Sequence, residues 1–220
     1  WGGGNLRQWP LALWEWVSEL FDEVELRGRW PEALRGGMVS MLPKGNTGEP
    51  LDYRPVVLLP MLYRRWARVR ARELDRWMQT AGLGALPGRS KGAEEHGLLF
   101  ALELEYAGAR GEWVEGLALD FSKAYDRMDI DMLEHMARQA RLPEWLWRPM
   151  LNMYRAPRIL KMGSTVGEWC HPTHGLVPGC PAATFWMALA TYPWIRAMRS
   201  LESQPTVRGW VDDLTAYVSG

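Results

Sequence analysis

Apolar residues along the chain follow helical spacing in some segments and strand-like spacing in others. In residues 11–24 they recur every three or four positions, which predicts an amphipathic helix. A long helix is expected at residues 61–80, directly after Pro60, because proline favours the start of a helix. Further helices are expected over residues 93–106, 130–140 and 142–154, and in a segment that continues to residue 198.

Short runs rich in β-branched and aromatic residues predict three hairpins and one further strand. The expected strand pairs are 38–42 with 53–59, 158–162 with 165–170, and 207–211 with 214–218. The apolar run 114–119 predicts a buried strand that ends at Asp120. Helices and strands are mixed throughout, so the fold class is α/β (α+β), and 47% hydrophobic composition is ample for a core.

Three carboxylates occupy strand ends. Asp120 follows the run 114–119, and Asp212 and Asp213 lie at the tip of the last hairpin. A carboxylate after a strand can simply cap the next turn. Adjacent like charges are unfavourable unless water solvates them or a cation bridges them. The residues alone leave two readings open, a solvated turn and a metal site.

The sequence around these acids resembles that of reverse transcriptases, most closely those of non-LTR retrotransposons and then those of group II introns. The resemblance rests on Asp120-Phe-Ser-Lys-Ala-Tyr-Asp126 and on Trp210-Val-Asp-Asp-Leu214, with further ordered matches from about Pro31 onward. It implies an RNA-directed DNA polymerase with a right-hand palm and a fingers subdomain. We expect a helical extension over 1–30, a fingers-like portion over 31–110 and a palm-like portion over 111–220. The thumb is expected to be absent, as in a piece of a longer protein.

The resemblance also implies the catalytic groups. Asp120, Asp212 and Asp213 would be catalytic and would bind two Mg²⁺ ions, with Mn²⁺ as an alternative, and the backbone carbonyl of Phe121 would be a further ligand. The partners implied are an RNA template, a DNA primer and deoxynucleoside triphosphates. Oxygen ligands are those that Mg²⁺ prefers.

Four residues are expected at the nucleotide. Lys44 and Arg54, on the first hairpin, correspond to the family's triphosphate-binding cations, which suits the point charge of Lys and the fork of Arg. Tyr125 corresponds to the ring beneath the sugar, and Gly179 lies in the segment that packs near the nucleotide. Arg89 is expected to contact the template.

Pro178 belongs to the same template-side segment, and there the sequence departs from the family. Pro178 stands where glutamine is usual, and Ala183 stands where serine is usual. Proline has neither a side-chain amide nor a backbone donor, so a hydrogen bond made by the glutamine is lost. This supports an alternative in which the chain is a decayed or domesticated retroelement fragment that only binds nucleic acid.

Charge and cysteine content add little to this interpretation. The net charge is zero, but 22 of the 26 basic residues are arginine, and six of them lie in the helix expected at 61–80. That helix is either a solvated basic face or a surface along a template backbone. Asp126 and Asp129 are expected to cap the helix at 130–140 rather than to bind metal.

Two cysteines imply no disulfide framework, and we expect an intracellular protein, in the nucleus or the cytoplasm. A zinc site formed by Cys170, His171, His174 and Cys180 is an alternative, although the spacing matches no standard finger. The uncharged stretch 169–195 is interrupted by prolines and glycines, so we expect no membrane segment.

Overall fold

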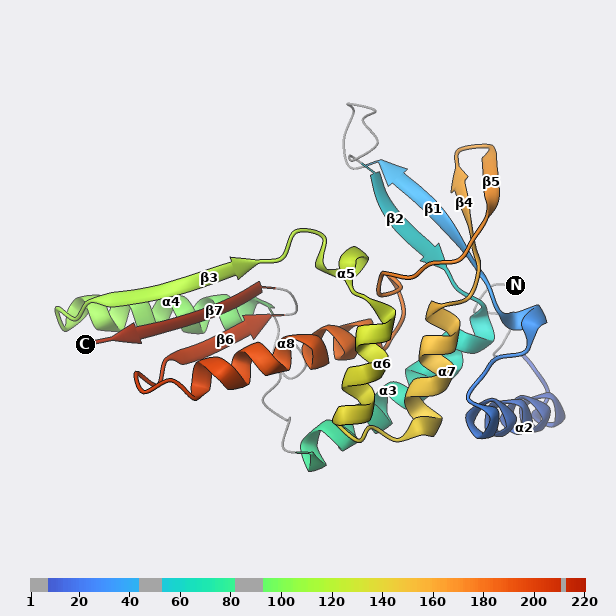
Figure 1. Ribbon diagram of the computed structural model, residues 1–220, viewed down its shortest axis with the longest axis horizontal. Coiled ribbons are helices and arrows are strands. Elements are labelled where there is room, and N and C mark those ends of the chain that lie inside the picture. Colours follow the sequence, from blue (N-terminus) through green and yellow to red (C-terminus); the bar gives the residue numbers. More distant parts are fainter. Residues whose placement is uncertain (1–7, 44–52, 82–92, 211–212) are drawn as a thin grey trace. The chain divides into compact units, whose positions relative to one another are not determined.

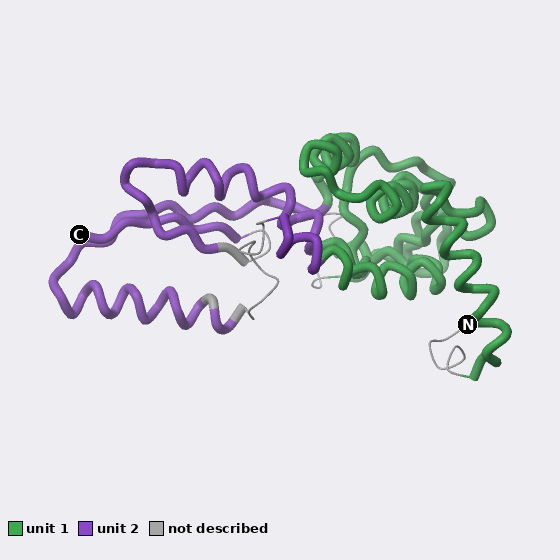
Figure 2. Tube along the Cα trace, turned by 90° about the horizontal axis from the view of Figure 1, so that it is seen from below, with its two compact units in different colours: residues 1–74, 126–183 green, residues 75–125, 184–220 purple. Residues whose placement is uncertain are grey.

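The computed structural model describes residues 8–43, 53–81, 93–210 and 213–220, which fall into two compact units. Figure 2 shows unit 1, residues 1–74 and 126–183, in green and unit 2, residues 75–125 and 184–220, in purple. Each unit combines segments far apart in the sequence. The expected fingers-like and palm-like portions therefore stay a prediction, and each unit is described by itself.

Unit 1 contains the long amphipathic helices that the apolar spacing predicts. Its helical elements are α2 (Leu11–Arg27), the short 3-10 helix η1 (Glu32–Leu34), most of α3 (Met61–Thr80), α6 (Ile130–Gln139) and α7 (Glu144–Tyr154). Helix α7 contacts both α2 and α6. The bounds expected for residues 61–80 are confirmed, and the other helices agree to within a few residues.

A four-stranded sheet completes unit 1. It is formed by β1 (Gly37–Pro43), β2 (Tyr53–Leu58), β4 (Arg158–Met162) and β5 (Thr165–Cys170), in the order β2-β1-β4-β5. Both predicted hairpins are confirmed as antiparallel pairs, and β1 joins them by pairing with β4 in parallel. Gly163, in the β4–β5 turn, has φ +59°. This left-handed backbone conformation favours glycine. Figure 1 shows the two hairpins side by side.

The core of unit 1 is built around three aromatic rings. The ring centroid of Trp30 lies 5.6 Å from that of Tyr63 and 5.7 Å from that of Trp66, both edge to face. All three side chains are buried. The indole N–H of Trp66 donates to Glu25 at 2.7 Å, and Arg70 donates to the same carboxylate oxygen at 2.6 Å. This cluster fastens α2 to α3.

Unit 2 is a three-stranded antiparallel sheet with helices packed on it. The strands are β3 (Val114–Asp120), β6 (Thr206–Trp210) and β7 (Asp213–Ser219), in the order β3-β7-β6. Helix α4 (Ala93–Ala109) contacts β6 and runs behind the sheet in Figure 1, while α8 (Ala183–Arg199) runs beside it. Arg208 of β6 pairs with Glu103 of α4 and also donates to the hydroxyl of Tyr217 at 3.1 Å. The predicted pairing of the last two strands is confirmed, since β6 and β7 are antiparallel neighbours and Asp213 begins β7.

The prediction that the strand at 114–119 is buried is wrong. Its residues are exposed except Leu119, and half of the Leu117 surface is accessible. The reason is topological: among the described residues, β3 pairs with β7 alone and so lies at the edge of its sheet. Apolar runs identify a strand without telling an edge strand from a central one.

The cap predictions at residues 126 and 129 have different outcomes. Asp129 is the N-cap of α6, where its Oδ1 accepts from the backbone N–H groups of Asp131 and Met132 at 2.7 and 3.1 Å. These two hydrogen bonds lower the pKa of the Asp129 carboxyl. Asp126 does not cap α6, because the chain forms a separate short helix there, α5 (Ala124–Arg127).

Glu134 links α6 to α7. Its ionisation is expected to make the stability of the protein depend on pH. It accepts from Arg138 at 2.8 Å and from Arg155 at 2.7 Å, and the hydrogen bond from Arg138 is the main cause that lowers its pKa. This stabilisation is fully present above about pH 4.3, the ordinary value of a free Glu, and is lost as the pH falls through the lower folded pKa.

We therefore expect Glu134→Gln to make the free energy of unfolding less sensitive to pH between neutrality and pH 3. Equilibrium urea unfolding at several pH values measures this. The matched control is Glu19→Gln on the exposed surface of α2, which should leave the pH dependence as it is in the wild type. Parallel curves for Glu134→Gln and the wild type would contradict the role assigned to Glu134.

Among the described residues, no helix is both long enough and apolar enough to cross a membrane.

Candidate functional site

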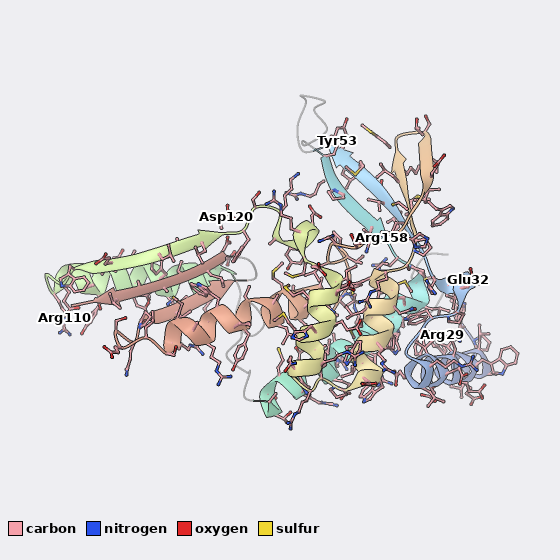
Figure 3. The ribbon with its side chains drawn as sticks, viewed as in Figure 1. Arg29, Glu32, Tyr53, Arg110, Asp120 and Arg158 are labelled. Carbon is pink, nitrogen blue, oxygen red and sulfur yellow. The ribbon has the colours of Figure 1, made fainter. Side chains whose placement is uncertain are left out.

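Two of the three predicted catalytic acids face each other across neighbouring strands. Asp120 is the last residue of β3, Asp213 is the first residue of β7, and the antiparallel register makes them direct partners. Both are exposed, and Figure 3 labels Asp120 at the end of its strand. Cβ atoms of such partners are about 4.5–5.5 Å apart, so both carboxylates can reach one point.

The sequence keeps the backbones of β3 and β7 close together. Gly116, opposite Tyr217, has no room for a side chain, since a Cβ there would lie 2.7 Å from the Cβ of Tyr217 and 2.8 Å from the carbonyl oxygen of Ala216. Glycine in a strand often marks such a close approach. Gly116 thus allows the close approach of β3 and β7 in the register that places Asp120 opposite Asp213.

Asp212, the third predicted acid, lies outside the described residues. In the sequence it lies between β6, which ends at Trp210, and β7, which begins at Asp213. Within the described residues, no group of three or more His, Cys, Asp or Glu side chains could hold a metal ion.

The donor set of Asp120 and Asp213 nevertheless fits a hard divalent cation. Like charges directly opposite each other in a sheet destabilise it, and a bound cation would relieve that repulsion. Both groups are carboxylates, the ligand type that Mg²⁺ selects. Their exposure leaves space for water molecules and phosphate oxygens, which complete the coordination of Mg²⁺ in enzymes.

Two further predicted residues follow Asp120 in unit 2. Phe121 comes directly after β3 and its side chain is exposed. Tyr125 is half-buried in α5, four residues beyond Phe121. The predicted roles of both, a metal-binding carbonyl and a ring beneath the sugar, stay predictions.

The remaining predicted residues belong to unit 1 or lie outside the described residues. Arg54 is exposed on β2, opposite Leu42 of β1, so the hairpin that was predicted to carry it is present. Lys44 directly follows β1 but lies outside the described residues, as does Arg89. Pro178 is half-buried and Gly179 is exposed.

A loop that is firmly held in unit 1 carries Pro178 and Gly179. The N–H of Gly175 donates to the carbonyl of Met128 at 2.7 Å, and the N–H of Ile130 donates to that of Thr173 at 3.2 Å. Gly179 has φ +84°, a left-handed conformation that favours glycine. The loop therefore presents an exposed glycine backbone at a defined position.

Cys180 anchors the other end of this loop. Its thiol is buried and lies 3.1 Å from the hydroxyl of Tyr63, which is itself buried in the aromatic core. Burial raises the pKa of the Cys180 thiol, and it also raises the pKa of the hydroxyls of Tyr63 and Tyr154. All three groups therefore stay protonated at neutral pH. This contact could not be predicted from the sequence, because its two residues are 117 positions apart in the chain.

The two cysteines are expected to differ sharply in reactivity. Cys170 is exposed and Cys180 is buried, and a thiol must ionise and meet the reagent in order to react. In the native protein a thiol-specific reagent should modify one cysteine rapidly, and Cys170→Ser should abolish that rapid phase. Full modification of both thiols should require denaturant. Rapid modification of the Cys170→Ser variant would contradict the buried position of Cys180.

Three of the four residues of the alternative zinc site have other contacts, namely Cys170, His174 and Cys180. The thiol of Cys170 contacts the carbonyl of Arg158 at 3.3 Å, and Cys180 contacts Tyr63. The ring of His174 bonds to the hydroxyl of Thr173 at 2.8 Å and lies 3.6 Å from a carboxylate oxygen of Asp129. These contacts explain the cysteines and His174 without a metal.

Comparison with known proteins supports the fold. No protein-family model matches the sequence, and no curated protein matches it. Among solved structures, an apo telomerase from Candida tropicalis, truncated from the C-terminal domain, matches with a TM-score of 0.57 at 9% sequence identity. The match covers 94% of this chain and 49% of the telomerase chain, so this chain spans about half of that length. The chain thus has a fold similar to that of this telomerase.

Proposed function

We propose that this chain is the fingers and palm portion of a retroelement reverse transcriptase. It would add deoxynucleotides to the 3′-hydroxyl of a DNA primer paired with an RNA template. The observation that carries the proposal is the direct pairing of Asp120 with Asp213 at the end of an acidic hairpin, in a fold similar to that of a telomerase. The sequence motifs favour the reverse transcriptases of non-LTR retrotransposons over those of group II introns.

Asp120, Asp212 and Asp213 would bind two Mg²⁺ ions, together with the backbone carbonyl of Phe121, and Mn²⁺ is an alternative. When bound, the ions would supply positive charge at the attacking 3′-hydroxyl and at the leaving pyrophosphate. The task of the protein is to hold the carboxylates in place. The closely packed strands β3 and β7 suit that task, because sites on regular elements are positioned more accurately than sites on loops.

The other proposed residues bind and orient the nucleotide and the template. Lys44 and Arg54 would hold the triphosphate, where a guanidinium can form two parallel hydrogen bonds. The ring of Tyr125 would lie beneath the sugar and exclude a 2′-hydroxyl. The exposed backbone at Gly179 would allow close approach of the nucleotide, and Arg89 would contact the template.

Pro178 favours a second candidate function. It replaces the glutamine that the family has at the template side of the Gly179 loop, and proline can donate no hydrogen bond from its backbone. A protein that has lost this contact but keeps its surface charges would bind nucleic acid without copying it. The two candidates differ in catalysis alone.

A template-directed assay separates the two candidates. The protein is incubated with poly(rA)/oligo(dT) and Mg²⁺, and incorporation of dTTP is compared with that of dGTP. Incorporation of dTTP alone, abolished by a chelator, supports the reverse transcriptase. Binding of the primer-template that weakens with salt, without incorporation, supports the binding remnant. Absence of both would overturn both candidates.

A further inference from the structure

Helix α3 carries a row of arginines on the side opposite its core residues. Arg64, Arg68 and Arg72 recur every fourth position, and Arg65 lies beside them; all four are exposed. The buried side chains of the helix, Tyr63, Trp66, Ala67, Leu74 and Met78, occupy the other face. At a rise of 1.5 Å per residue the row extends over about 12 Å. We call these four residues the α3 arginine row; all belong to unit 1.

The α3 arginine row differs from three exposed arginines that lie on other helices of unit 1. Arg27, Arg138 and Arg148 each pair with a glutamate one turn earlier in their own helix. Among the described residues, Arg64, Arg68 and Arg72 form no ion pair, and the position one turn away from each holds another arginine. Like charges with this spacing destabilise a helix. The row therefore has an energetic cost that an external polyanion would offset.

Aromatic residues of α2 and its N-terminal flank adjoin the row. The guanidinium of Arg65 lies 5.6 Å from the ring centroid of Trp14, and Trp14 in turn lies 5.6 Å from Trp9. Both tryptophans are half-buried, so part of each ring is accessible. A row of cations beside accessible rings is the combination that binds single-stranded nucleic acid, since phosphates contact the cations and bases stack on the rings.

From this arrangement we propose that the α3 arginine row, with Trp14 and Trp9, is a binding surface for single-stranded nucleic acid. Arginine favours this partner, because its planar fork matches phosphate oxygens and its face stacks on bases. The proposal deepens the proposed function, on which it rests for the identity of the polyanion. It requires no catalysis, so it can be tested without incorporation.

The first test measures binding of fluorescently labelled single-stranded RNA and DNA by anisotropy over a range of salt, with a chelator present. We compare wild type with the triple variant Arg64→Gln, Arg68→Gln, Arg72→Gln. Loss of three phosphate contacts lowers the salt slope by about 2, since each contact on a single strand contributes about 0.7. Affinity should fall about 100-fold at about 0.1 M salt if the two curves meet near 1 M.

The matched control is the triple variant Arg27→Gln, Arg138→Gln, Arg148→Gln. It also removes three positive charges, from other exposed sites of unit 1. It should change the salt slope much less. Glutamine keeps helix propensity and removes the repulsion along α3, so the α3 variant should unfold at or above the wild-type temperature. Weak binding would then not reflect unfolding.

A second pair of variants tests the rings. Trp14→Ala should weaken binding of the single strand about tenfold, because each stacked base contributes appreciably. Trp16→Ala, on the same helix and 69% exposed, should have little effect. Equal losses for these two variants would contradict the stacking role of Trp14.

Three outcomes would overturn the proposal. One is unchanged nucleic-acid binding in the α3 triple variant, and another is an equal loss in the control triple variant. The third is that the α3 variant loses binding to phosphatidylserine vesicles while its binding of RNA and DNA stays at the wild-type level. If nucleotide incorporation fails but the α3-dependent binding persists, the proposed catalysis is wrong and the surface remains.

Discussion

Replacing Asp120 by Asn is expected to reduce Mg²⁺-dependent dTTP incorporation on poly(rA)/oligo(dT) by about 10³-fold or more. The substitution keeps the size of the side chain and removes the charge that faces Asp213. Metal-assisted phosphoryl chemistry relies on several kcal/mol of charge stabilisation, and each 1.36 kcal/mol is a factor of about ten in rate. Single-turnover incorporation with saturating primer-template measures the effect on chemistry.

Asp126→Asn is the matched control for this substitution. Asp126 is an exposed acid in α5, six residues further along the chain. Its replacement by Asn likewise removes one negative charge. We expect its rate to stay within about threefold of wild type, a change of less than 1 kcal/mol. Binding of the primer-template should be unchanged in both variants. Comparable activity of Asp120→Asn and wild type would show that the paired carboxylates have no catalytic role.

Trp66→Ala is expected to cause the largest loss of stability. The side chain is fully buried between Trp30 and Tyr63, and its indole N–H donates to Glu25 at 2.7 Å. Removing a buried tryptophan costs about 3–5 kcal/mol, a large share of the free energy of unfolding of a typical domain. Loss of the indole also leaves one hydrogen bond of Glu25 unmade.

Equilibrium urea unfolding, followed by far-UV circular dichroism, measures this loss. Trp16→Ala removes the same side chain from an exposed position of α2 and should change the free energy of unfolding by no more than about 0.5 kcal/mol. Trp66→Phe should lie between the two, because part of the ring packing is kept. If Trp66→Ala is as stable as Trp16→Ala, the aromatic cluster does not hold α2 on α3.

The elements that could be predicted are those whose signals are local. The helix over residues 61–80 has a proline before it and clear periodicity, and the β4–β5 turn has a glycine where φ is positive. The acidic hairpin was predicted from two short β-prone runs that flank Asp212 and Asp213. In each case neighbouring residues carry the information, so no tertiary contact had to be known.

The features that were missed depend on contacts between distant segments. Exposure of β3 follows from its place at the edge of the sheet, which its apolar sequence does not reveal. The contact of Cys180 with Tyr63 and the pairing of Arg208 with Glu103 join segments more than 100 residues apart. The parallel pairing of β1 with β4 is likewise a property of the assembled sheet.

In the candidate site, too, local sequence motifs identified the residues, and contacts between distant segments determined their arrangement. The sequence motifs identified Asp120 and Asp213 as candidates. The register of β3 and β7 shows that the two residues lie directly opposite each other. Gly116 allows the close approach of these strands, because it has no side chain. The arginine row on α3 was visible in the sequence, but its lack of ion pairs among the described residues required the structure.

Mn²⁺ electron paramagnetic resonance measures directly whether Asp120 and Asp213 bind a divalent cation. Free Mn²⁺ is titrated with wild type and with Asp120→Asn, each bound to the same chain-terminated primer-template and dTTP. We expect the wild type to bind Mn²⁺ that Mg²⁺ can displace, and we expect a marked loss of that binding in Asp120→Asn. Equal Mn²⁺ binding by the two proteins would contradict this expectation.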